Sequence, residues 1–297
     1  MKTNRLTYAF LLVLACCLCA CEHVDMEKYA SGDGVDITFR VDKLEQIPFE
    51  TSNITSRAVN DLSKVCSRIN LAVFEGENKV TSFDQTSDTP GFGTLKIKLP
   101  KGNYTIVIVA HSGLGNATLS SPTKVSFYKN KVTDTFNYVA NITVGDQSSD
   151  YNIELKRAVA KFRLRINDDQ IPAEVKQFKF YYTGGSSTLN CVTGFGEVNS
   201  RQTEYRDIPT KSSDGYYIFD VYTFPHADGK ELKMKIDAID VAGNSIQGTE
   251  FPLVPVTTNR ITQYTGQFFS GIQANSPAGI KISIDDSWDS SYYNVTF

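Results

Sequence analysis

The sequence predicts an all-β protein built from two consecutive β-sandwich domains. From about residue 35 onward, apolar and polar residues alternate with a period of two, as strands with one buried face require. Turn-forming residues interrupt this pattern roughly every ten residues. Tyr and Phe, which favour strands, number 15 and 18 among the 297 residues. A short helix is predicted only near residues 59–68.

The N-terminus is predicted to be an export signal and not part of the fold. Two basic residues open the chain, and the apolar stretch 6–20 is shorter than the ~20 residues that a membrane-spanning helix needs. The stretch ends in Leu18-Cys19-Ala20-Cys21, which resembles the bacterial lipobox. We therefore expect a signal peptide over residues 1–20 and a lipid on Cys21. The alternative is an ordinary signal peptide, with the cysteine incidental.

The mature chain is expected to begin with a lipidated tether over residues 21–34. Acyl chains contribute about 0.8 kcal/mol for each buried methylene, so two or three of them hold a protein stably on a membrane. The formal net charge of −3 gives no reason to bind nucleic acid. Cys66 and Cys191 are the cysteines that remain after Cys21. They fall in different domains, so we expect buried thiols, with a disulfide as the alternative.

The first sandwich is expected to span residues 35–155. Its opening strand, 35–41, alternates strictly between apolar and polar residues. Residues 95–99 and 104–110 flank a Pro-Lys-Gly-Asn turn, so they are predicted to form a hairpin. The second of these strands is apolar on both faces and should lie inside the sandwich. Further strands are expected at 68–74, 123–128, 136–144 and 150–155.

The second sandwich is expected to span residues 156–297, because a polar, turn-rich gap at 145–150 precedes the change of domain. Its strand at 160–166 should direct Ala, Phe and Leu into the core. Lys156, Arg157 and Lys161 should then face solvent or the seam between the domains. The last six residues are left open between closing this sandwich and pairing with a neighbour. Further strands are expected at 175–182, 216–224, 232–239, 261–269 and 280–284.

No arrangement of residues in the sequence predicts a catalytic, metal or cofactor site. His23, His111 and His226 lie far apart and lack cysteines at ligand spacing, so each is expected to be solvated or part of a core. The sequence holds no nucleophile elbow, phosphate loop or dinucleotide-binding loop. Asp285 and Asp286 are adjacent on a strand and would point to opposite faces, so they would not flank one glycosidic bond. We expect a non-enzymatic protein without a cofactor.

Four segments between about residues 22 and 290 share their pattern with a known family. They are INLAVF at 69–74, LPKGNYT at 99–105, YNIELKRAVAKF at 151–162 and NRITQYTGQFF at 259–269. In this order they resemble the anchor and accessory subunits of the fimbrillin family, which are fimbrial lipoproteins of Bacteroidales. Acidic residues directly after Cys21 resemble the signal that sends such lipoproteins to the outer face of the outer membrane. The resemblance implies two tandem transthyretin-like sandwiches.

The resemblance implies a cell-surface subunit that assembles with other fimbrial subunits by exchanging a β-strand and that takes part in adhesion. The strand 35–41 is the candidate for exchange. Arg57 lies in a polar segment after it, and shaft-type relatives are cut after such an arginine. A cut there would release the lipid and the strand together, whereas an anchor must keep both, so cleavage and permanent anchoring are competing interpretations.

The alternative function is a surface glycan-binding lipoprotein of a polysaccharide-uptake system. In that case the paired tyrosines at 181–182, 216–217 and 292–293 would stack on sugar rings. Aromatic packing between neighbouring strands explains the same pairs equally well.

Overall fold

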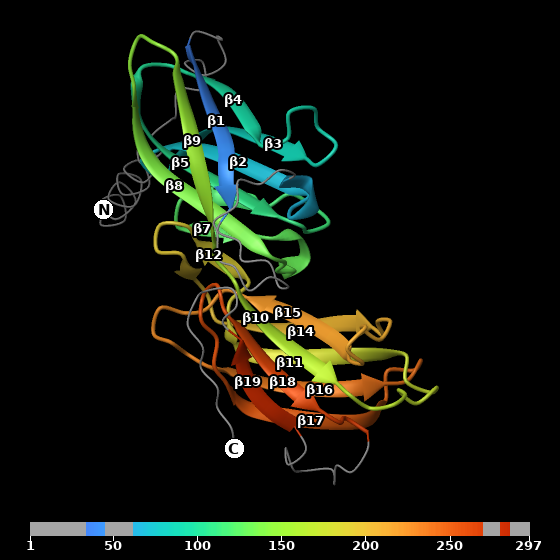
Figure 1. Cartoon of the computed structure of the whole chain (residues 1–297). Helices are drawn as coiled ribbons and strands as arrows, with labels where there is room; N and C mark the ends of the chain where they lie inside the picture. Colours follow the sequence, from blue (N-terminus) through green and yellow to red (C-terminus); the bar gives the residue numbers. More distant parts are fainter. Residues whose placement is uncertain (1–33, 45–61, 270–279, 286–297) are drawn as a thin grey trace, which may run out of the picture.

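The computed structural model describes residues 34–44, 62–269 and 280–285, the last of these by backbone alone. The regular secondary structure of the described chain is almost all β-strand, and the strands form two layered bodies in succession (Figure 1). This confirms the predicted all-β fold. The helical segments within these ranges are two single 3-10 turns, and none is long and apolar enough to cross a membrane. They are η1 (Leu62–Lys64), where the short helix was predicted, and η2 (Tyr128–Asn130).

The first body is a sheet folded back on itself to make two layers. Its order is β3-β2-β5-β8-β9-β1-β4, and β8 joins β9 through two residue pairs, Phe136 with Arg157 and Asn137 with Lys156. The sheet bends back on itself at this junction, and apolar side chains from both layers fill the space between the layers. The strands are β1 (Val35–Leu44), β2 (Arg68–Glu75), β3 (Asn78–Thr86), β4 (Thr94–Leu99), β5 (Gly102–His111), β8 (Thr135–Val144) and β9 (Ser149–Arg157).

The predicted hairpin between residues 95–99 and 104–110 is wrong. β4 pairs with β1 in one layer, whereas β5 lies between β2 and β8 in the other. The turn after β4 carries the chain across the sandwich, and the hydroxyl of Tyr104 donates a hydrogen bond of 3.1 Å to the Pro100 carbonyl at this corner. The prediction that β5 is buried on both faces is confirmed. Ile106 and Ile108 face the core of the first body, and Val107 and Val109 face a further cluster.

The second body has two separate four-stranded sheets, ordered β15-β10-β18-β19 and β14-β11-β16-β17. Phe162 and Leu164 of β10 lie in the core between them, as predicted. β19 pairs antiparallel with β18, so the predicted closing strand is confirmed, while the last six residues lie outside the described part. The strands are β10 (Ala160–Ile166), β11 (Gln177–Gly185), β14 (Ser200–Asp207), β15 (Tyr217–Thr223), β16 (Leu232–Ile239), β17 (Ser245–Val254), β18 (Ile261–Gly266) and β19 (Ile280–Asp285).

A small third sheet joins the two bodies, which the sequence did not predict. Its order is β13-β12-β7-β6, and Leu189 of the second body pairs with Val125 of the first. A third apolar cluster lies beneath it and contains side chains from both bodies, including Phe127 and Phe224, whose ring centroids are 5.4 Å apart. Its strands are β6 (Thr118–Ser121), β7 (Lys124–Ser126), β12 (Thr188–Asn190) and β13 (Phe195–Gly196).

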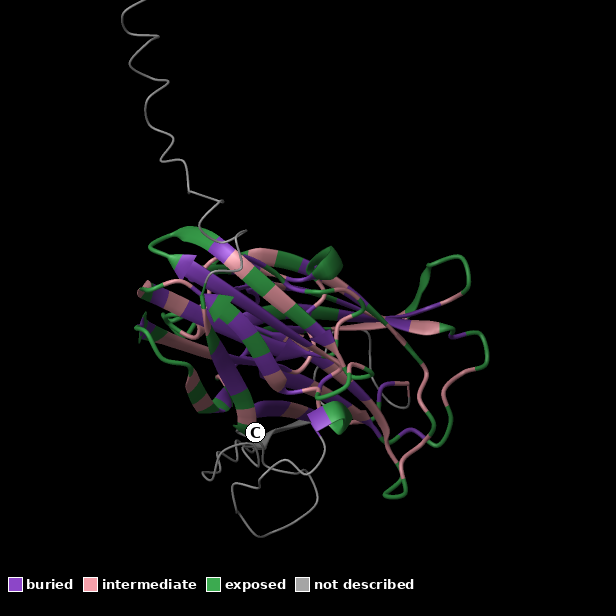
Figure 2. Cartoon of the chain, turned by 90° about the horizontal axis from the view of Figure 1, so that it is seen from above, coloured by how far each residue is buried: buried purple, intermediate pink, exposed green. Residues whose placement is uncertain are grey.

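The alternation read from the sequence is visible as burial. Along many strands, buried residues alternate with less buried ones (Figure 2). β9 ends at Arg157 and β10 begins at Ala160, so the chain passes from one body to the other over two residues. Because a shared sheet and core connect the bodies, the division into domains at residue 156 stays a prediction.

Candidate functional site

The first strand, the candidate for exchange, occupies an internal position in its sheet. β1 pairs antiparallel with β4, from Val35 with Leu99 to Arg40 with Thr94. On its other side it pairs parallel with β9, ending at Leu44 with Leu155, after a register shift between Val41 and Lys43. β1 therefore bridges two strands that would otherwise lose a neighbour. We call this position the β1 seat.

One face of β1 is part of the core. Ile37, Phe39 and Leu44 are each at most 1% exposed, and Phe39 stacks on Tyr151 with ring centroids 5.2 Å apart. The opposite face carries exposed charged residues, among them Arg40, whose guanidinium lies 3.1 Å from the Asp150 carboxylate. The predicted alternation of this strand is confirmed except at Thr38, a polar residue that is also buried. Three core side chains and two ladders of main-chain hydrogen bonds hold it in place.

The two site residues predicted near the N-terminus, Cys21 and Arg57, lie outside the described residues. In the sequence, Arg57 falls between the end of β1 at Leu44 and the start of η1 at Leu62. A cut after Arg57 would therefore separate β1 from the rest of the protein. Both residues stay predictions.

A buried arginine fastens the joint between the bodies. Arg157 is 3% exposed and grips both carboxylate oxygens of Asp134, at 2.8 and 3.0 Å. Its remaining nitrogen donates to the side-chain oxygen of Asn259 in the second body, at 2.9 Å. The guanidinium also lies 4.8 Å from the centre of the Phe136 ring. Such bidentate, charge-assisted bonds fix geometry as well as energy.

The partners of Arg157 were missed from the sequence. Of the two positions predicted for its side chain, the seam is correct and solvent is wrong. Asn259 has a φ of 60°, a left-handed conformation that favours asparagine over most other residues. Its backbone N–H donates a hydrogen bond of 2.8 Å to the Val159 carbonyl. An asparagine between two predicted strands is the signal that could have indicated this turn.

Two further lysines lie at the seam. Lys131 in the first body donates a hydrogen bond of 2.6 Å to the Thr203 carbonyl and one of 2.9 Å to the Glu204 carboxylate, both in β14. Lys161, which was also predicted to face solvent or the seam, is 2% exposed and lies 3.4 Å from Asp220. Burial lowers its pKa to about 8, and the Asp220 carboxylate opposes that shift. The contacts of Lys131 tie the first body to β14 of the second, whereas the pair of Lys161 and Asp220 lies within the second body. Because Lys161 is buried, the prediction that it faces solvent is wrong.

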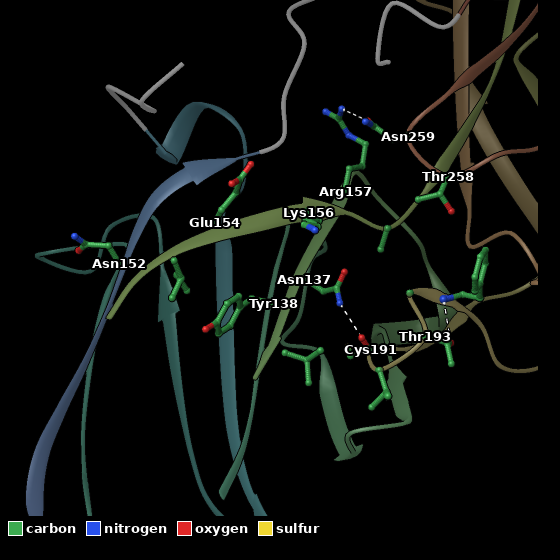
Figure 3. A pocket seen from close by; sticks show the side chains of 16 residues that line it. Asn137, Tyr138, Asn152, Glu154, Lys156, Arg157, Cys191, Thr193, Thr258 and Asn259 are labelled. Carbon is green, nitrogen blue, oxygen red and sulfur yellow. Dashed lines mark hydrogen bonds between the residues drawn. The ribbon is translucent and has the colours of Figure 1, made fainter. Parts of the chain in front are cut away.

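A cleft of about 720 Å³ opens beside the joint (Figure 3). The first body supplies residues of β8 and β9, among them Tyr138, Asn152 and Glu154, and the second body supplies Thr193 and Thr258. Most of the polar side chains that reach it are amides or hydroxyls, and apolar side chains make up the rest of the lining. Glu154 and Lys156 carry opposite charges, and Arg157, which also lines the cleft, is paired with Asp134. The cleft therefore has a mixed and nearly neutral lining.

The side chains of His111, Cys66 and Cys191, which are of types that can act in catalysis or bind metal, are buried in the cores. His111 is 1% exposed; its Nδ1 accepts from the Gly113 amide at 3.0 Å, and its Nε2 lies 3.0 Å from the Asn70 side-chain oxygen. Burial lowers the pKa of His111 to about 4. Cys66 and Cys191 are free and buried, as predicted, and burial raises the pKa of each thiol to about 12. The described residues contain no group of three metal-ligating side chains.

The described tyrosine pairs are also largely engaged. Tyr182 is 1% exposed and donates to the Tyr222 carbonyl, and the Arg165 guanidinium lies 3.8 Å from the centre of the Tyr216 ring. Tyr181 is 38% exposed. The described pairs therefore do not form an open aromatic platform for sugar.

Residues 33–296 match the family model described as fimbrillin-A associated anchor proteins Mfa1 and Mfa2. No curated protein sequence matches the chain. Among solved structures, it is similar to the fimbrial anchor protein Mfa2 from Porphyromonas gingivalis, with 12% identity, a TM-score of 0.43 and coverage of 84% of this chain and 95% of that one. It is also similar to the tip fimbrial protein Mfa3 from the same organism, with 13% identity, a TM-score of 0.43 and coverage of 85% of this chain and 99% of that one. A fimbrial assembly protein from Parabacteroides distasonis has 13% identity and a TM-score of 0.44, with coverage of 89% of this chain and 100% of that one.

Proposed function

This chain belongs to the family of fimbrillin-A associated anchor proteins and is a fimbrial subunit of the anchor or accessory type; from this premise we propose that β1 is the strand through which it assembles with other subunits. The observation that carries the proposal is the position of β1 between β4 and β9. Loss of β1 would leave both neighbours with unpaired edges, and a strand from another subunit would satisfy them.

The stability of the first body depends on a strand in the β1 seat, which is what an exchange of strands between subunits requires. Burial of an aliphatic or aromatic side chain contributes about 1.5–3 kcal/mol, so Ile37, Phe39 and Leu44 together contribute roughly 4–9 kcal/mol. This is comparable to the total stability of a domain, about 5–15 kcal/mol. A first body without β1 would therefore be marginal until another strand filled the seat. Main-chain pairing would supply affinity, and alternate side chains would supply register.

Two routes lead to an empty seat, and they differ at the N-terminus. A cut after Arg57 would release β1 and the lipid on Cys21 together. Without the cut, β1 stays tethered at a high effective concentration, of order millimolar, and an incoming strand must compete with it. N-terminal sequencing of the protein from the cell surface separates the routes: a start at Ala58 establishes cleavage, and a start at modified Cys21 excludes it.

We further propose that Cys21 carries the lipid that attaches the uncut subunit to the outer membrane. The family implies a fimbrium at the cell surface, and the predicted lipobox supports the anchor. Growth of the cells with a clickable palmitate analogue tests this. Label on the wild type and none on the Cys21→Ser variant is expected, and an unlabelled wild type would exclude the anchor.

A disulfide lock tests the exchange itself. Asp36 of β1 and Lys98 of β4 are direct partners and both are exposed, so cysteines at these two positions can fasten β1 to its seat. The matched control fastens Glu75 of β2 to Asn78 of β3, which are also exposed partners. The oxidised β1 lock should be missing from sheared fimbriae and should return on reduction, while the control assembles in both states. Equal assembly of the oxidised β1 lock would refute exchange.

We propose a non-catalytic role, with adhesion as an additional task of the assembled fimbria. The family and the similar structures are fimbrial proteins, and the described histidines and cysteines are committed to cores or lie apart. Sugar binding is not favoured, because Tyr182 is buried and Tyr216 is covered by Arg165. A glycan array tests this point, and binding that depends on Tyr181 would restore the alternative.

A further inference from the structure

We propose that the cleft beside the joint is a second peptide-binding site, distinct from the β1 seat, which takes an extended and weakly charged segment of a partner fimbrial subunit as an added strand. The partner's identity rests on the function proposed above. The site itself rests on the walls, lining and rigidity of the cleft.

A strand edge forms one wall of the cleft. β8 pairs with β5 over its whole length, from His111 with Thr135 to Gly102 with Val144. On its other side it meets β9 only at Phe136 and Asn137, and no other described strand pairs with that side. The main chain of Tyr138 and Val139, which line the cleft, therefore lies on an open edge within the described part of the chain. Such an edge is a template for an added strand.

The lining has the chemistry of peptide recognition. The side-chain amide of Asn152 and the hydroxyl of Thr193 offer both donors and acceptors, as a peptide main chain does. The amide of Asn137 already donates to the Cys191 carbonyl at 3.2 Å. The hydroxyl of Thr258 is buried at the cleft and makes no hydrogen bond with any described residue. A buried polar atom without a partner is costly, and a bound main-chain group would satisfy it.

The charges of the cleft exclude a strongly charged ligand. Glu154 and Lys156 lie on the same strand two residues apart and offset one another. Arg157 is already bonded to Asp134 and Asn259, so it is committed to the joint. Neither an anionic nor a cationic patch results, and a segment of amide, hydroxyl and small apolar residues fits best.

The cleft is formed in advance of binding. One wall belongs to the first body and the other to the segments around Thr193 and Asn259 of the second (Figure 3). The pairing of β7 with β12 and the bond from Arg157 to Asn259 hold the walls together. A preorganised site loses little entropy on binding, and about 720 Å³ lies within the usual range of ligand pockets.

The cleft also lies next to the β1 seat. Arg40 of β1 pairs with Asn152 of β9, and Lys43 pairs with Glu154, both of which line the cleft. A partner subunit that reaches the β1 seat therefore comes within reach of the cleft. The cleft stays available when β1 remains in its seat. This chain could therefore bind a partner through the cleft even if it is never cut after Arg57.

Photo-crosslinking on intact fimbriated cells tests the proposal. A photoreactive phenylalanine replaces Thr193, which is exposed at the cleft, and in a matched strain it replaces Val241, which is 87% exposed on a loop that does not line the cleft. Mass spectrometry should map crosslinks from position 193 to one short extended segment of another fimbrial subunit, and none from position 241. Crosslinks confined to this chain, from a subunit that is present in fimbriae, would overturn the proposal.

Blocking the cleft gives an independent readout. Thr193→Trp should lower the affinity of the purified subunit for fimbriae from a strain that lacks it by about tenfold, and Val241→Trp should not. Unchanged affinity of a folded Thr193→Trp variant would refute the cleft alone. If the wild-type subunit itself failed to bind fimbriae, the proposed function would fall as well.

Discussion

Replacing Phe39 with alanine tests how firmly β1 is held. The ring is fully buried in the core of the first body and stacks on Tyr151, with ring centroids 5.2 Å apart. Phe39→Ala removes this contact and leaves a cavity in the core. The exposed Asp36 on the same strand provides the control, Asp36→Ala, because it loses a side chain without loss of core packing.

The expected cost is about 4 kcal/mol, the middle of the range for truncation of a buried phenylalanine. This corresponds to roughly a thousandfold change in the equilibrium between seated and open β1. Since β1 supplies its own hydrogen bonds to β4 and β9, opening should expose amides on all three strands. Asp36→Ala should change the opening free energy by less than about 0.5 kcal/mol.

Native-state hydrogen exchange measured by mass spectrometry follows this opening directly. In Phe39→Ala, amides of β1, β4 and β9 should exchange about a thousandfold faster, while those of β11 and β16 in the second body keep their protection. A labelled peptide with the sequence VDITFRVDKL should also enter the variant more readily than the wild type. A change in opening free energy below about 1 kcal/mol would refute the assigned packing.

Three further predictions concern the joint, pH and the thiols. Arg157→Met should lower the free energy of unfolding in urea by about 3–5 kcal/mol, because it leaves the Asp134 carboxylate unpaired. The control Arg40→Met, on the exposed face of β1, should lower it by less than about 1 kcal/mol. Equal effects of the two substitutions would contradict the buried joint. Because burial lowers the pKa of His111 from 6.5 to about 4, the folded state favours the neutral ring, so stability present above pH 6.5 is lost as the pH falls toward 4. The loss is about 3 kcal/mol, and a His111→Gln variant should lack that part of the pH dependence in urea titrations; an unchanged profile would refute the assignment. Cys66 and Cys191, whose pKa values are raised to about 12 by burial, should resist iodoacetamide at pH 8 in the native protein and react in urea, and rapid native labelling followed by mass spectrometry would contradict their burial.

Local patterns were sufficient to predict the strands that build the cores. The alternation of β1 and β10 placed Phe39 and Phe162 correctly, because a strand with one buried face can satisfy only one register. Pairing between strands was not predictable in the same way. Residues 95–99 and 104–110 have the spacing of a hairpin, yet the turn between them crosses from one layer to the other, and only the partners of β4 and β5 distinguish the two cases.

Three edge strands were missed because their residues are mostly polar. β3, β14 and β17 each pair with a neighbour on one side and carry few buried residues, so their sequences have little apolar alternation. The joint was missed for another reason. β12 pairs with β7 some sixty residues earlier in the chain, and Arg157 binds Asn259 about a hundred residues later. No local pattern encodes contacts at such separations.

The double-sided burial of β5 was the sequence feature that came closest to revealing the joint. Val107 and Val109 point away from the first core, and a sandwich with a solvated outer face would have polar residues there. Their apolar character requires a second cover, which the shared sheet and Phe224 of the second body provide.

The strand that lies beside β4 in the assembled fimbria tests the central claim most directly. In the isolated protein, a photoreactive phenylalanine in place of Lys96 should crosslink to the chain's own β1 near Thr38, its register partner. In purified fimbriae, the same position should crosslink to a peptide from another subunit, identified by mass spectrometry. Crosslinks in fimbriae that still lead only to the chain's own β1 would contradict strand exchange.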